Sequence, residues 1–183
     1  MAKIALAGEG GQGVQAIAQI MVNAAFNEGK NACYLPNFGL EQRGGVSLSF
    51  VQISDSEIGA PKFKISDIVI ALSKRAVVRT KQYVGPDTIF IYDNTRVAES
   101  PDYAARKILG IPATDVANKE LSSRVFNIII LGTVIKVTGI LGVDSVKYAL
   151  QESLKEKFLK NPDLKDLNFK ALESGMSLVE EVL

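Results

Sequence analysis

Short apolar runs alternate with helically spaced apolar positions along the first two thirds of the chain. Residues 3–7 form an apolar run that ends in glycines, and positions 14, 17, 18, 21, 22 and 25 are apolar at the spacing of one helix face. We therefore predict a strand over Lys3–Ala7 and a helix over Val14–Glu28, which Gly29 is placed to end. Two more continuous apolar runs, Asp67–Leu72 and Thr88–Tyr92, are typical of buried strands. This alternation predicts an α/β fold.

Two further strands, Asn31–Pro36 and Val46–Ile53, are separated by the nine-residue loop Asn37–Gly45. A parallel crossover needs about a dozen residues or more, so we expect these strands to be antiparallel neighbours in a mixed sheet. The other short elements predicted in this part are a helix over Lys74–Tyr83, a strand over Ile108–Pro112, and a helical turn that Thr114 or Asp115 would cap and that leads to Leu121.

The most apolar stretch, Val125–Val143, is 19 residues long, close to the roughly 20 that span a bilayer. Asn127 and Lys136 lie within it, and a charge at mid-span costs about 2.5 to 3.5 kcal/mol. We therefore expect a buried central helix rather than a membrane span.

The last 40 residues carry 14 charged side chains, against 27 in the first 143, which indicates solvated helices. Apolar positions trace one helix face from Val143 to Phe158 and another from Leu172 to Leu183, and Asn161-Pro162 breaks the chain between them. We expect a single domain over residues 1–183, with an α/β core over 1–143 and C-terminal helices over 144–183.

The composition excludes several classes of chemistry. The chain has no histidine, so triads built on histidine are excluded, and its one cysteine, Cys33, allows neither an iron-sulfur cluster nor a four-ligand zinc site. We expect no metal site in this chain. The net charge of +1 gives no global field toward nucleic acid or anionic lipid. A single unpaired cysteine and the absence of a signal-peptide pattern favour the cytoplasm.

A glycine-rich hexapeptide follows the first strand and opens the first helix. Gly8-Glu9-Gly10-Gly11-Gln12-Gly13 matches GxGxxG, where free backbone N–H groups and the helix dipole can face an anion. A dinucleotide site also needs an acid at the end of the second strand, which here ends in Leu35-Pro36-Asn37, while the nearest acid, Glu28, precedes that strand. Dinucleotide binding, binding of another anion and a structural tight turn all remain open on this pattern.

The loop over 37–45 is the second candidate. Three glycines surround a Glu-Gln-Arg core, and the guanidinium of Arg43 could clamp a phosphate or carboxylate. The alternative is a flexible hairpin loop with solvated charges. In an α/β sheet this loop could lie near the Gly8–Gly13 turn, and the two would then form one binding edge.

Several strings together resemble the gamma subunit of 2-oxoacid:ferredoxin oxidoreductases, and also the equivalent subunit of indolepyruvate:ferredoxin oxidoreductase. They are GEGGQGV at 8–14, FGLEQRGGVS at 38–47, DIVIALS at 67–73, IPAT at 111–114, FNIIILG at 126–132 and LNFKALESG at 167–175. The resemblance covers nearly the whole chain. It implies a Rossmann-like three-layer α/β domain with a mixed, mostly parallel sheet and a helical C-terminal segment.

The resemblance also implies a function. Such complexes decarboxylate a 2-oxoacid oxidatively to an acyl-coenzyme A and pass electrons to ferredoxin. Alpha and beta subunits would hold thiamine diphosphate, while beta and a ferredoxin-like delta subunit would hold iron-sulfur clusters. The gamma subunit would supply no catalytic residue, would bind no cofactor alone and would be inactive in isolation, where it could form a homodimer. In the complex it would complete the active site and the coenzyme A or anion region.

Carried onto this chain, the resemblance marks two groups as cofactor-binding candidates. They are Gly8, Gly10, Gly11, Gln12 and Gly13 in the turn, and Glu41, Gln42, Arg43, Gly44 and Gly45 in the loop. The family commonly has Tyr or His where this chain has Phe38, so a hydrogen bond from that position is lost. The alternatives are a stand-alone NAD(P)- or FAD-binding oxidoreductase that uses Lys or Tyr for acid-base chemistry, and a sensor of coenzyme A or a nucleotide.

Other polar side chains have simpler expected roles. Asn127 would be buried and tie down backbone rather than contact a ligand, and Asn168 would cap or pack before the last helix. Asp93 and Asn94 would form a turn, and Cys33 would be a small buried residue rather than a nucleophile.

Overall fold

A six-stranded sheet forms the centre of the molecule. The computed structural model describes residues 1–37 and 45–180. The strand order is β2-β3-β1-β4-β5-β6. The strands are β1 (Ala2–Glu9), β2 (Asn31–Asn37), β3 (Val46–Ser54), β4 (Ile68–Ala71), β5 (Ile89–Asp93) and β6 (Lys107–Ile111).

The sheet is mixed, as predicted. β3 pairs antiparallel with both β1 and β2, whereas β1, β4, β5 and β6 pair parallel in that order. The predicted antiparallel pairing of β2 and β3 is therefore confirmed, because the short connection between them leaves no length for a crossover helix.

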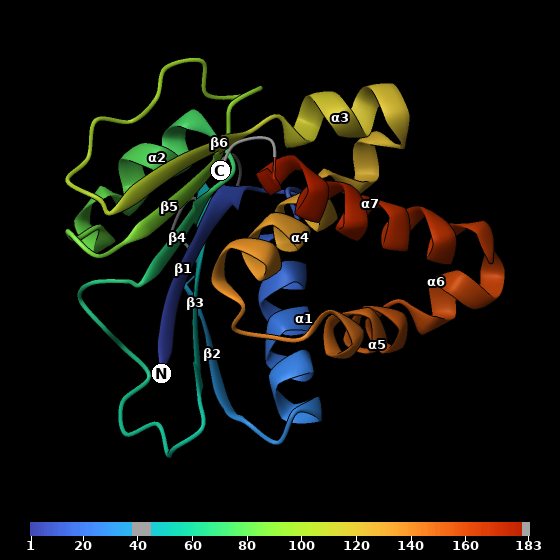
Figure 1. Ribbon diagram of the computed structural model, residues 1–183, viewed down its shortest axis with the longest axis horizontal. Helices are drawn as coiled ribbons and strands as arrows, with labels where there is room; N and C mark the ends of the chain where they lie inside the picture. Colours follow the sequence, from blue (N-terminus) through green and yellow to red (C-terminus); the bar gives the residue numbers. More distant parts are fainter. Residues whose placement is uncertain (38–44, 181–183) are drawn as a thin grey trace.

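Helices cover both faces of the sheet (Figure 1). One face carries α1 (Val14–Asn27), α4 (Phe126–Thr138), α5 (Val143–Ser153) and α7 (Asp163–Glu180), and the other carries α2 (Lys74–Thr80) with the short turn η1 (Lys81–Tyr83). Side chains of β1 alternate between the layers: Ile4 and Leu6 join the larger core, and Ala5 and Ala7 the smaller one. The expected three-layer Rossmann-like α/β fold is confirmed.

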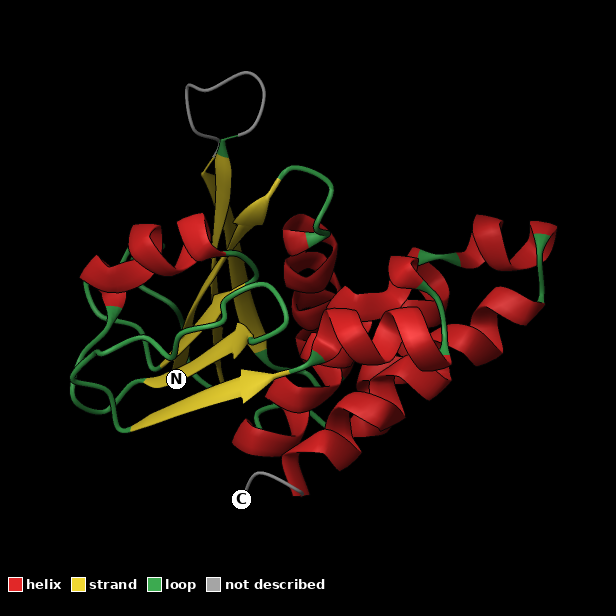
Figure 2. Ribbon diagram, turned by 90° about the horizontal axis from the view of Figure 1, so that it is seen from above, coloured by secondary structure: helices red, strands yellow, loops and turns green. Residues whose placement is uncertain are grey.

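The C-terminal helices pack onto the helices of the α/β part (Figure 2). α5 contacts α1, and α7 lies against α4, while α6 (Lys155–Lys160) connects α5 to α7. Val146 and Leu150 of α5 and Leu172 of α7 belong to the same core as β1 and α1. The break expected at Asn161-Pro162 separates α6 from α7.

The apolar stretch forms a helix shorter than its sequence pattern. After the short turn η2 (Ser123–Val125), α4 runs over 13 residues and ends before Gly139, whose φ of 60° is left-handed. Nine residues from Phe126 to Ile135 are buried, as expected for a central helix. Within residues 1–37 and 45–180, no helix has the length and apolarity needed to cross a bilayer.

Three local predictions were wrong. α3 (Ala113–Glu120) begins after Pro112 without a side-chain cap, so neither Thr114 nor Asp115 caps it. Asn168 lies inside α7 rather than before it, and its Nδ2 donates to the Leu164 carbonyl at 2.6 Å. Cys33 is only half-buried, because β2 forms an edge of the sheet.

Candidate functional site

The Gly8–Gly13 turn is held by the side chain of Gln12, which is 7% exposed. Its Oε1 accepts from the Glu9 N–H at 2.6 Å, and its Nε2 donates to the Leu72 carbonyl after β4 at 3.2 Å. A Cβ on Gly8 would come within 2.7 Å of Gln12 Oε1. Gln12 therefore joins the carboxyl ends of β1 and β4, and Gly8 leaves the room that the Gln12 side chain needs.

The second half of the turn brings backbone to a surface. Gly11 and Gly13 have φ of 86° and 75°, which side chains rarely adopt, and Gly13 caps α1. A Cβ on Gly10 or Gly11 would meet nothing within 4 Å. The first N–H groups of α1 have no partner within the helix, so the end of α1 at this turn favours a negatively charged group.

Asn127 lies directly over this turn. A Cβ on Gly13 would collide with the side-chain amide of Asn127. Asn127 Oδ1 is buried and has no hydrogen-bond partner among the described residues, so the expectation that this side chain ties down backbone was wrong. Asn127 instead contacts the turn and lines a cavity beside it.

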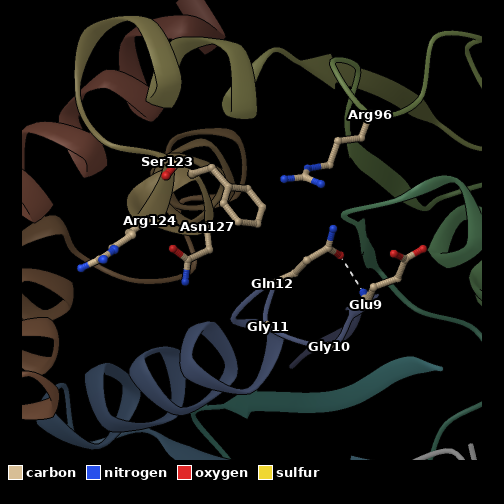
Figure 3. A pocket seen from close by; sticks show the side chains of 9 residues that line it. Glu9, Gly10, Gly11, Gln12, Arg96, Ser123, Arg124 and Asn127 are labelled. Carbon is tan, nitrogen blue, oxygen red and sulfur yellow. Dashed lines mark hydrogen bonds between the residues drawn. The ribbon is translucent and has the colours of Figure 1, made fainter. Parts of the chain in front are cut away.

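That cavity has a volume of about 470 Å³ (Figure 3). Three separate parts of the chain meet around it: the β1–α1 turn, the turn after β5, and the start of α4 with η2. The lining residues are Glu9, Gly10, Gly11, Gln12, Arg96, Ser123, Arg124, Phe126 and Asn127. Arg96, Ser123 and Arg124 were not predicted. The sequence signal for Arg96 is its place three residues after Asp93, at the carboxyl end of a strand where ligand groups often lie.

The charges around the cavity favour an anion. Arg96 and Arg124 supply two guanidinium groups to the lining, against the single carboxylate of Glu9. Phosphate and carboxylate groups are the ligands that such donors bind.

The second motif can be placed only through its ends. Glu41, Gln42, Arg43, Gly44 and Phe38 lie outside the described residues, whereas Gly45 immediately precedes β3. Asn37 pairs with Leu48, and Val46 pairs with Glu9 of the turn. Both described ends of this loop therefore lie at the same end of the sheet as the Gly8–Gly13 turn, where β1 finishes.

The topology speaks against a dinucleotide at the turn. In such sites a parallel strand beside the first carries the ribose-binding acid, whereas here antiparallel β3 lies between β1 and β2. Glu28 follows the far end of α1, where its Oε1 accepts from the Gly142 N–H at 2.6 Å and its Oε2 lies 2.8 Å from Lys30 Nζ. Burial raises the pKa of Glu28, but these hydrogen bonds lower it by more, so its pKa lies below the ordinary value.

Asp93 forms the turn that was expected of it. Its Oδ1 accepts from the Thr95 N–H at 3.1 Å, and its carbonyl accepts from the N–H groups of Arg96 and Val97. Its Oδ2 also lies 3.5 Å from Arg96 Nε. In the part of the chain that the structure describes, no three Cys, Asp or Glu side chains gather as a metal site would require.

Comparison with known proteins gives consistent matches over nearly the whole chain. Residues 3–178 match the model of the family described as pyruvate ferredoxin/flavodoxin oxidoreductase. The ketoisovalerate oxidoreductase subunit VorA of Methanothermobacter thermautotrophicus is 31% identical over 179 residues. That match covers 98% of this chain and 36% of VorA, so the chain spans about a third of that relative's length.

Two solved structures have the same fold. The gamma subunit of a keto/oxoacid ferredoxin oxidoreductase from Geobacter sulfurreducens superposes with a TM-score of 0.82 at 26% identity, covering 97% of this chain and 98% of that one. A 2-oxoglutarate:ferredoxin oxidoreductase from Magnetococcus marinus, solved with 2-oxoglutarate, coenzyme A and succinyl-CoA bound, gives a TM-score of 0.87 at 23% identity. This chain matches 31% of the length of that protein.

Proposed function

The chain belongs to the pyruvate ferredoxin/flavodoxin oxidoreductase family, and on this basis we propose that it is the gamma-type subunit of a 2-oxoacid:ferredoxin oxidoreductase complex. The observation that carries the proposal is the match over residues 3–178, supported by the likeness to a gamma subunit of nearly the same length. The complex converts a 2-oxoacid anion and coenzyme A to an acyl-coenzyme A, carbon dioxide, a proton and two electrons, and ferredoxin accepts the electrons.

In this proposal the partner subunits hold the redox centres. Alpha and beta subunits bind thiamine diphosphate, and beta with a ferredoxin-like delta subunit binds the iron-sulfur clusters. A chain with one cysteine and no histidine is suited to this division of labour, because cluster ligands are mainly cysteine thiolates. The chain alone is inactive, and we place the complex in the cytoplasm.

This chain contributes the coenzyme A or anion region. Gly10, Gly11, Arg96 and Arg124 line one cavity, and backbone N–H and guanidinium groups are the donors that suit the phosphates of coenzyme A. Arg43 and its neighbours Glu41, Gln42, Gly44 and Gly45 belong to a loop that is followed by Val46, the partner of Glu9, and we assign them to the same end of the sheet. Gly8, Gln12 and Gly13 support it from within the turn.

Purification of the tagged chain from its own cells tests this proposal. We expect two larger subunits to co-purify, together with thiamine diphosphate and the brown absorbance of iron-sulfur clusters. An unrelated protein with the same tag is the control. A chain that purifies without these partners, or that carries a bound nicotinamide or flavin, contradicts the proposal and favours a stand-alone dinucleotide-binding oxidoreductase.

A further inference from the structure

The side chain of Asp93 is a fully buried carboxylate at the carboxyl end of β5. Burying a carboxylate is costly unless charged or polar partners compensate for the lost water. Its Oδ1 accepts from a backbone N–H, as described above, while its Oδ2 accepts from the hydroxyl of Thr114 in α3. The remaining partner of Oδ2 is Arg96, whose side chain is 39% exposed. A buried charge thus supports an arginine at the surface.

Thr114 connects these two charges in a fixed direction. A hydroxyl has one proton, and Thr114 donates it to Asp93, so the same oxygen accepts from Arg96 Nε at 2.8 Å. The Cζ of Arg96 also lies 5.0 Å from the ring centroid of Phe126, on the cavity wall. Nε and one face of the guanidinium are thereby occupied.

The outer edge of the guanidinium stays open to the cavity. Neither Nη atom of Arg96 has a hydrogen-bond partner among the described residues, and Figure 3 shows the group reaching over the cavity above Gln12. The two Nη groups form a fork that matches two oxygens of a phosphate. The Gly10–Gly11 backbone borders the same cavity.

We propose that Asp93 and Thr114 are positioning residues that hold Arg96 over this cavity to bind a phosphate group of a phosphorylated ligand. The inference rests on the proposed function, in which coenzyme A supplies that phosphate. It adds that Arg96 binds through a prearranged fork, so that its position counts as well as its charge.

Asp93 could affect phosphate binding in two ways, through its own negative charge or by positioning Arg96, and a substitution that removes the charge separates them. A carboxylate near an anion site repels the anion, so a role through charge alone predicts tighter phosphate binding in Asp93→Asn. Positioning predicts weaker binding, because the guanidinium loses its charged partner. Thr114→Val removes the connecting hydroxyl at nearly constant size and charge, and Thr114→Ser restores it.

The experiment titrates the purified full chain with inorganic pyrophosphate, coenzyme A or pantetheine, which lacks phosphate, in a calorimeter at fixed ionic strength. We expect pyrophosphate and coenzyme A to bind and pantetheine not to bind. Arg96→Lys should weaken pyrophosphate binding about tenfold, because a lysine cannot bind bidentately.

Thr114→Val and Asp93→Asn should weaken pyrophosphate binding severalfold, and Thr114→Ser should bind within about twofold of the wild type. Arg79→Lys, at an exposed position of α2 on the opposite face of the sheet, is the matched control and should change nothing.

The outcomes distinguish this inference from the proposed function. Binding of Thr114→Val equal to the wild type, tighter binding of Asp93→Asn, or a wild-type chain that binds neither pyrophosphate nor coenzyme A overturns the inference, even if the chain assembles with oxidoreductase subunits. If the variants bind pyrophosphate as expected but the chain never assembles with such subunits, the proposed function is overturned instead. In an assembled complex, Thr114→Val should raise the KM for coenzyme A without lowering kcat at saturating coenzyme A.

Discussion

Within the Gly8–Gly13 turn, the side chain of Gln12 holds the turn in place and the backbone of Gly10 borders the cavity. Gln12 uses both ends of its amide to join Glu9 to Leu72, so its side chain is held in place by the protein. Gly10 makes no such contact and borders the cavity, where a Cβ would meet no protein atom. The turn therefore contains a supporting side chain and, next to it, backbone that is free to approach a ligand.

Gly10→Ala should separate binding from folding. The added methyl group enters the cavity without a clash and without a left-handed φ, so the free energy of unfolding should change by less than about 0.5 kcal/mol. Binding of pyrophosphate, measured by calorimetry, should weaken severalfold, because the methyl group occupies space beside the backbone donors. Gly59→Ala, also in open space but away from this cavity, is the control. Equal affinities in both variants would show that Gly10 does not border the ligand.

Glu28→Gln should destabilise the protein in a pH-dependent way. The pKa of Glu28 is lowered in the folded state, so this carboxylate stabilises the fold above its unfolded pKa of about 4.3, and the stabilisation is lost as pH falls through the folded pKa. Urea unfolding at pH 7 should show a loss of about 1 to 2 kcal/mol, and at pH 3 a clearly smaller one. Exposed Glu99→Gln is the control. A loss that does not diminish toward pH 3 would refute the assigned role.

At the scale of elements, the crossing of α4 and α7 holds the C-terminal helices on the molecule. A Cβ on Gly132 would collide with the backbone carbonyl of Leu172, and one on Gly175 with that of Ile129. Thr133 Oγ1 also lies 3.0 Å from the Gly175 carbonyl and donates to it. The two helices approach each other so closely that only glycine is accommodated at these points.

Gly175→Ala should therefore lower the free energy of unfolding by about 3 kcal/mol, since the backbone of α4 would have to move. Helix propensity alone would favour alanine by about 1 kcal/mol, so the sign of the change tests the packing. Ser177→Ala, at an exposed position two residues away on the same helix, should stay within about 0.5 kcal/mol in the same urea titration. A stabilised Gly175→Ala variant would rule out the close crossing.

Local patterns predicted most elements, and contacts between distant residues account for what they missed. The β2–β3 pairing follows from loop length alone. The start of α3 was misjudged because Thr114, a good cap by type, is bonded to Asp93 21 residues earlier. Arg96 and Arg124 were not predicted, because the cavity is lined by three segments that lie far apart in the sequence. The glycines of its β1–α1 turn were predicted from their motif.

At the scale of the whole molecule, the chain is one part of a proposed assembly. Its sheet carries the glycine turn and the ends of the second motif at one edge, and a cavity with two arginines opens there. With no histidine and one half-buried cysteine, its composition does not supply the four ligands of an iron-sulfur cluster. The central claim is that this edge completes a site whose cofactors are bound by other subunits.

Reconstitution tests this claim most directly. The alpha and beta subunits that co-purify with the chain, with delta if it is present, are assayed for 2-oxoacid-dependent and coenzyme A-dependent reduction of a viologen dye, with and without this chain. We predict that the chain alone gives no reduction, that the partners alone give little, and that adding the chain in stoichiometric amount restores it. Turnover by the isolated chain, or full activity of the partners without it, would contradict the account.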